Sequence, residues 1–134
     1  MFSGKTVLER LDSKTYQLNS TLSYENDSIK VTIKPGLKTD GASIPKLFWS
    51  IIGCPLMGKY VGSALIHDGL YGSHKLSQKE SDQLFLEMMK HNKVKWFRRS
   101  LMYMAVRIGG RFAYNGKSEE EVAEMSKFVT VKEK

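Results

Sequence analysis

The pair His67-Asp68 stands out because two ionisable residues lie in a segment with almost no other charge. Residues 60–71 read YVGSALIHDGLY, and the only other polar side chains are one serine and two tyrosine hydroxyls. A helix with so little polar surface is expected to be buried. Burying an ionisable side chain without a partner is costly or shifts its pKa until it is neutral. We therefore expect His67 and Asp68 to have partners, a ligand or a catalytic task.

Asp82 is the expected partner of His67. The two residues lie at equal distances from the ends of the segment 72–77, so an antiparallel helical hairpin would bring them to similar height. A carboxylate there would fix the imidazole tautomer and leave the other ring nitrogen to activate a water as a general base. The predicted catalytic residues are His67 and Asp82. Tyr71, one helical turn from His67, is expected to support them by hydrogen bonding.

Asp68 points about 100° away from His67 around the same helix, so it is expected to have a separate role. We expect it to hold a divalent cation, calcium in preference to zinc, with Asp40 as a tentative second ligand. The segment 39–45, TDGASIP, offers a carboxylate, hydroxyls and backbone amides in a glycine-containing turn. It is suited to fold over a site and to contribute Asp40 or Ser43.

The patterns around these residues predict an α+β fold, with a small N-terminal antiparallel β-sheet followed by a three-to-four-helix bundle. Residues 28–33 alternate between apolar and polar side chains, as a half-buried strand does, and small polar residues predict turns at 11–14 and 25–28. The expected organisation is a single domain over 1–134. It has a β region at 1–36, a loop and short helix at 37–58, and a helical region at 59–128.

Three helices and a short fourth are expected in the helical region. They run from about 59 to 71, from Ser77, from about 94 to 112, and from Ser118, and the last residues, 132–134, are expected to fray. Ser77 and the glutamate three residues later match a capping box. On the second helix Asp82 falls inside the apolar arc, which again predicts a buried carboxylate.

The third helix is expected to pack through one apolar face and to present a basic, aromatic face on another side. The predicted core face comprises Phe97, Leu101, Met104, Ala105, Ile108 and Phe112. Tyr103, Arg107 and Arg111 lie on the other face, where aromatic rings among arginines can hold phosphates or stacked bases. The ordinary alternative is a face that only covers another element or meets solvent.

The composition narrows the class of protein. The chain has 134 residues, a net charge of +7 and one cysteine, Cys54. One cysteine excludes an intramolecular disulfide framework and a multi-cysteine zinc site, and fits a reducing compartment. No window approaches the roughly 20 apolar residues of a transmembrane segment, and the N-terminus does not resemble a signal peptide. The positive charge leaves a polyanion partner as a weak alternative.

The helix and its partner carboxylate resemble the phospholipases A2 over about residues 60–90. In that family a His-Asp-x-x-Tyr helix pairs with an Asp on an antiparallel helix. The resemblance implies that His67 is the base, Asp82 its orienting partner, Asp68 a calcium ligand and Tyr71 a support. The glycine-rich calcium loop and the flanking cysteines of the phospholipases are absent here.

A second resemblance covers more of the chain. TDGASIP at 39–45, Phe48-Trp49, HDGLY at 67–71 and DQLF at 82–85 are similar in order and type to a small phage- and prophage-associated family of unknown function. This resemblance implies an origin in a phage genome and a location in the host cytoplasm or the virion.

Two function classes follow from these residues. The first is hydrolysis of an ester or phosphoester bond, including those of phospholipids. The second is a noncatalytic phage protein, either a virion or tail component or a factor that binds a host protein, in which His67 and Asp82 are a structural brace. Accessibility separates the two, because an open cleft at the pair favours chemistry and a sealed pair favours the brace.

Overall fold

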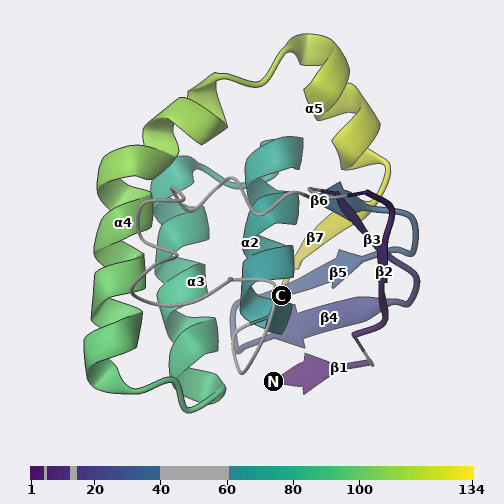
Figure 1. Ribbon diagram of the computed structural model, residues 1–134. Helices are drawn as coiled ribbons and strands as arrows, with labels where there is room; N and C mark the ends of the chain where they lie inside the picture. The colour runs from purple at the N-terminus through teal and green to yellow at the C-terminus, as the bar shows by residue number, and fades with distance from the viewer. Residues whose placement is uncertain (5, 13–14, 40–60) are drawn as a thin grey trace.

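The N-terminal part of the protein forms two small antiparallel sheets. The computed structural model describes residues 1–4, 6–12, 15–39 and 61–134 (Figure 1). The strands are β1 (Phe2–Ser3), β2 (Leu8–Arg10), β3 (Tyr16–Leu18), β4 (Leu22–Glu25), β5 (Ile29–Ile33), β6 (Lys38–Thr39) and β7 (Val129–Glu133). One sheet has the order β1-β4-β5-β7 and the other β2-β3-β6. The expected strand at 28–33 is confirmed as β5.

Four helices follow β6 and precede β7 in the described part of the chain, so the predicted α+β class is confirmed. They are α2 (Val61–Ser73), α3 (Gln78–His91), α4 (Trp96–Asn115) and α5 (Glu119–Ser126). The predicted capping box is present at the start of α3, where the Ser77 hydroxyl accepts from the Glu80 amide and the Glu80 carboxylate accepts from the Ser77 amide. The short helix expected within 37–58 lies outside the described residues.

The turn predicted at 25–28 joins β4 to β5. The side-chain oxygen of Asn26 accepts hydrogen bonds from the backbone amides of Ser28 and Ile29, which reverses the chain. The β4–β5 hairpin then places Tyr24 opposite Val31. Both side chains belong to the main core, which lies between this sheet and α2.

The C-terminal residues do not fray as expected, because β7 pairs antiparallel with β5 and completes the larger sheet. Val131 lies opposite Val31, and Lys134 forms an ion pair with Glu25. Residues 129–132, VTVK, alternate between apolar and polar side chains, and the alternation ends there. That short pattern becomes a strand because β5 offers an edge with unpaired backbone groups.

The expected core face of α4 is wrong. Its buried residues are Met102, Ala105, Val106 and Gly110, and they belong to a different arc of the helix from most of the predicted set. Of that set, Phe97, Met104, Ile108 and Phe112 are exposed. Periodicity alone favoured the more hydrophobic arc, whereas the structure buries the arc with smaller side chains, which allows close approach to α3 and to Tyr71.

Candidate functional site

Helix α2 lies between the larger sheet and the other helices and is buried along almost its whole length. Every residue from Gly62 to Ser73 is buried, as the uncharged sequence predicts. Close packing depends on small residues, since a Cβ at Gly69 would lie 2.9 Å from the Ile33 side chain. The helix therefore carries His67 and Asp68 into the interior.

The predicted contact between His67 and Asp82 is present. The imidazole Nε2 lies 2.7 Å from Asp82 Oδ1, and both side chains have 0% exposure. Helix α3 brings Asp82 to the height of His67 because α2 and α3 are consecutive helices packed side by side (Figure 1). The His67 ring also packs 4.6 Å from the Phe85 ring, measured between centroids. These contacts fix the orientation of the imidazole.

Asp82 is the acceptor at the centre of a four-residue network, which we call the Asp82 hub: His67, Tyr71, Asp82 and Arg107. Tyr71 donates its hydroxyl to Oδ1, and Arg107 Nη1 donates to Oδ2 at 2.9 Å. Burial, followed by the hydrogen bond and the charge of Asp82, raises the pKa of Tyr71 above its usual range, so this hydroxyl stays protonated and donates. Three donors from three different residues thus converge on one carboxylate.

Arg107 and Gly110 are members of this site that sequence reasoning missed. Arg107 was assigned to a basic binding face, but its guanidinium reaches into the interface between α3 and α4 and forms an ion pair with Asp82. Gly110 lies against Tyr71, since a Cβ there would come within 2.4 Å of the hydroxyl oxygen. The one available signal was Asp82 itself, because a carboxylate on an apolar arc requires a cation or several donors.

Asp68, the next residue along α2, points about 100° away from His67 and is also buried. Thr39, at the end of β6, donates its hydroxyl to Asp68 Oδ2. The start of the TDGASIP segment is therefore beside Asp68, as the sequence led us to expect. Asp40 and Ser43 lie outside the described residues, so their predicted roles stay predictions.

The other predicted side chains are not gathered at the hub. Tyr103 is half-buried, and Arg111 lies over the Phe112 ring, 5.1 Å from its centroid. His74 contacts the Tyr114 carbonyl through Nε2 at 2.8 Å. Among the described residues, no group of three or more His, Cys, Asp or Glu side chains is arranged to hold a metal ion.

The hub is closed to solvent except at Arg107, whose side chain is 35% exposed. A hollow elsewhere, beside α5, is lined by Gly36, Lys38, Met125 and Phe128 together with three glutamates, and no hub residue lines it. A sealed pair was expected for a structural brace and an open cleft for catalysis, so the burial of the hub favours the brace. The orientation of His67 by the Asp82 carboxylate favours a catalytic role.

The sequence of the hub region agrees with a known protein family. The model of a family described as a protein of unknown function, DUF1353, matches residues 16–106, which include His67, Tyr71 and Asp82. This chain belongs to the DUF1353 family. No solved structure matches the chain. The family description names no reaction, so the function of the hub has to be argued from its geometry.

Two curated relatives of this DUF1353 chain come from Sinorhizobium fredii (strain NBRC 101917 / NGR234). The uncharacterized protein y4jT is 34% identical over 92 residues, which cover 68% of this chain and 27% of y4jT. The uncharacterized protein y4iH is 35% identical over 78 residues, covering 58% of this chain and 33% of y4iH. The chain therefore spans a third or less of the length of these relatives.

Proposed function

We propose that this DUF1353 protein hydrolyses ester or phosphoester bonds, with His67 as the general base. The observation that carries the proposal is the Asp82 hub, in which one buried carboxylate orients His67 through Nε2 while Tyr71 and Arg107 hold the carboxylate. Such an arrangement sets the tautomer and stabilises the imidazolium that forms when the base takes a proton. In this proposal Asp82, Tyr71 and Arg107 are positioning residues.

The proposed step uses the second ring nitrogen of His67. Nδ1 takes a proton from a water molecule, and the resulting hydroxide attacks the carbonyl carbon or the phosphorus. The bond to the leaving oxygen then breaks, and that oxygen takes the proton back from Nδ1. Asp68, held by Thr39, lies one residue along the helix and would bind the divalent cation or the polar group that faces the developing negative charge.

A contribution to stability does not by itself explain why charged side chains are buried in the hub. Replacing a buried ion pair by apolar side chains of similar volume is often neutral or stabilising, so charge in a core is not explained by the need for a brace. The phospholipase resemblance supports the same conclusion, since Tyr71 lies four residues after His67 and both donate to the same carboxylate. Phospholipid esters are therefore the first substrate class to test.

The second candidate is a noncatalytic protein in which the hub joins α2, α3 and α4. Its supporting observation is the 0% exposure of His67 and Asp82, since a substrate would reach Nδ1 only after side chains moved apart. The partners in that case would be virion, tail or host proteins. The phage origin and the location in host cytoplasm or virion belong to this proposal, and mass spectrometry of purified virions would test them.

Substitution of His67 separates the two functions. His67→Asn should abolish release of fatty acid or phosphate from a panel of phospholipid and chromogenic ester substrates. The matched control His74→Asn changes the same kind of side chain at the Tyr114 contact and should leave the rate unchanged. If wild type shows no hydrolysis across the panel, or if His67→Asn retains it, the hydrolase proposal is refuted.

The cation is tested without an activity assay. Calcium, and more weakly zinc, should raise the melting temperature of the wild type, because a ligand that binds only the folded state stabilises it. Asp68→Asn should remove that rise, whereas Asp27→Asn, an exposed acid in a turn, should keep it. A rise of equal size in Asp68→Asn would exclude Asp68 as the ligand.

A further inference from the structure

Helix α4 carries an exposed apolar stripe, which we define as Phe97, Met104, Ile108 and Phe112. Their exposed fractions are 64%, 54%, 67% and 70%, and Trp96, at the first position of the helix, is 70% exposed. At 100° per residue the four side chains of the stripe fall within an arc of about 80°. Large apolar groups in a continuous row on the surface mark an interaction site more often than scattered ones do.

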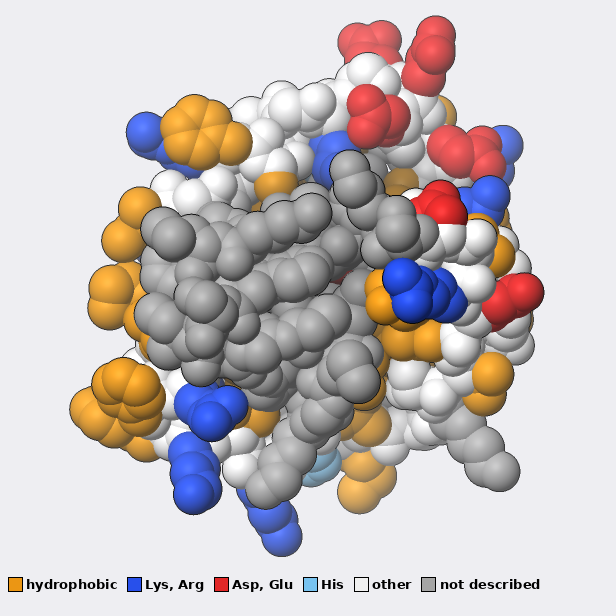
Figure 2. All heavy atoms as spheres, in the orientation of Figure 1, with side chains coloured by type: hydrophobic (Ala, Val, Ile, Leu, Met, Phe, Trp, Pro, Cys, Tyr) orange, Lys and Arg blue, Asp and Glu red, His pale blue; other side chains and the backbone are white. Residues whose placement is uncertain are grey.

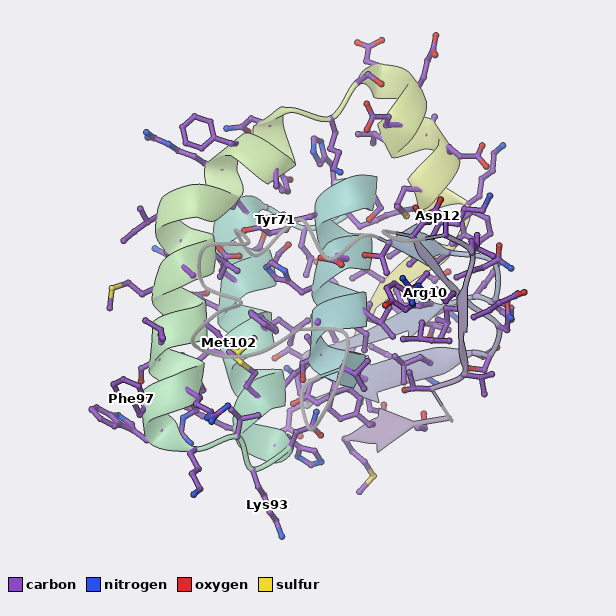
Figure 3. All side chains as sticks on the ribbon, in the orientation of Figure 1. Arg10, Asp12, Tyr71, Lys93, Phe97 and Met102 are labelled. Atoms are coloured by element: carbon purple, nitrogen blue, oxygen red, sulfur yellow. The ribbon has the colours of Figure 1, made fainter. Side chains whose placement is uncertain are left out.

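The opposite arc of α4 is packed into the protein, so the stripe is held in place. Met102 and Val106 pack in one cluster with Phe85 and Met89 of α3, Ala105 is buried, and Gly110 lies against Tyr71. Figure 2 shows apolar side chains protruding along the α4 edge of the molecule, at the left of the view. In Figure 3, Phe97 points outward near the start of α4 whereas Met102 points inward. The stripe is therefore a projecting ridge.

The charge around the stripe has one sign. Residues 88–118 contain no Asp or Glu and eight Lys or Arg: Lys90, Lys93, Lys95, Arg98, Arg99, Arg107, Arg111 and Lys117. Arg98 and Arg111 are exposed and lie about 60–80° from the centre of the stripe on its two sides. In Figure 2 the acidic side chains lie instead toward α5 and the sheet, among Lys and Arg side chains. The α4 edge is therefore basic and apolar, and α4 itself carries no acidic side chain.

We propose that α4 docks on an anionic lipid surface, with the stripe inserted among the acyl chains near the headgroups and the flanking arginines at the lipid phosphates. A helix with aromatic and aliphatic residues on one face and Lys or Arg beside them lies in the membrane interface in this way. Among the described helices, none has the length and hydropathy of a membrane span. This docking does not depend on the hydrolytic function.

The same features disfavour two other binding partners for the stripe, a second copy of the chain and a nucleic acid. A second copy of the chain would bring two basic, acid-free helices together, and like charges repel at that distance. A nucleic acid would match the arginines and Trp96, but it offers no apolar surface to cover Met104 and Ile108. An anionic bilayer offers both the phosphates and the apolar layer, and being fluid it needs no groove shaped to the ridge.

Vesicle flotation tests the docking. The full chain should partition onto vesicles of phosphatidylcholine with about one-quarter phosphatidylglycerol at least about tenfold more strongly than onto pure phosphatidylcholine, and the difference should shrink at high salt. The double variant Ile108→Gln/Phe112→Gln should bind about tenfold more weakly. Arg98→Gln and Arg111→Gln should each cost about fivefold. Trp96 fluorescence should shift to the blue on binding and lose that shift in Trp96→Phe.

Matched substitutions away from α4 serve as controls. Val7→Gln removes an exposed apolar side chain and Lys132→Gln an exposed charge, and neither should change vesicle binding. Thermal melting checks that each variant is folded, and Phe97→Gln/Met104→Gln provides a second stripe variant.

Absence of binding to anionic vesicles overturns the proposal, as does binding that both stripe variants leave intact. A dimer in ultracentrifugation that the stripe variants abolish, or oligonucleotide binding without vesicle binding, would assign the ridge to another partner and also overturn it.

Discussion

Substitution of Asp82 by Asn tests the hub directly, because it removes the charge while nearly keeping the shape. In the native hub two buried donors, His67 Nε2 and the Tyr71 hydroxyl, bind Oδ1, and Arg107 binds Oδ2. The amide of Asn offers one neutral oxygen and an NH2 group that cannot accept. That NH2 group faces either Arg107, which can only donate, or His67 and Tyr71, which must then give up the donation that they make in the native hub.

The expected cost follows from these contacts. Weakening a buried hydrogen bond from a charged to a neutral acceptor loses about 1 kcal/mol, and leaving a buried donor without an acceptor costs about 1–3 kcal/mol. Arg107 is 35% exposed and can regain water, so its loss adds at most about 1 kcal/mol. The free energy of unfolding should therefore fall by about 2–5 kcal/mol. For a chain of this length, the melting temperature should fall by about 7–18 °C.

Urea unfolding followed by circular dichroism measures this change. Asp27→Asn makes the same chemical change at an exposed turn and should alter the free energy of unfolding by less than about 0.5 kcal/mol. Arg107→Met should cost about 1 kcal/mol alone and less in the Asp82→Asn background, since the two residues share one ion pair. A loss below about 1 kcal/mol in Asp82→Asn would refute the view that three donors depend on this carboxylate.

Three further predictions concern the contact of Gly110 with Tyr71, the ionisation of Tyr71, and the cap at the start of α3. Gly110→Ala should destabilise the protein by about 1–3 kcal/mol in denaturant melts, because its Cβ would meet the Tyr71 hydroxyl, and Tyr71→Phe should relieve most of that cost; an equal cost in both backgrounds would contradict the contact. Because burial raises the pKa of Tyr71 in the folded state, unfolded chains lose this proton first as pH rises above about 10, so stability should fall there, and less steeply in Tyr71→Phe. An identical slope in the variant would assign the pH dependence to other groups. Ser77→Ala should cost about 1 kcal/mol in thermal melts through loss of the α3 cap, and no change would mean that the cap is redundant.

Local sequence patterns predicted the parts of this protein that depend on neighbouring residues. The uncharged run around His67 implied a buried helix, and the serine and glutamate at 77 and 80 implied the start of α3. The contact between His67 and Asp82 was also predictable, because a short loop between two antiparallel helices fixes which residues lie at the same level along the helix axes. Each of these features is set by spacing along the chain, which sequence displays directly.

Tertiary structure alone decided which face of α4 is buried and how the chain ends. The arc with Ala105 and Gly110 packs inward although the arc with Phe97 and Ile108 is more hydrophobic, since close approach to Tyr71 requires a residue without a side chain. Arg107 thereby reaches Asp82, and β7 pairs with the distant strand β5, with Val131 opposite Val31. Sequence determined which residues needed partners, because burial and charge are local properties. It did not determine the partners that more distant segments supply, such as Arg107, because contacts between distant segments depend on how all the elements pack at once.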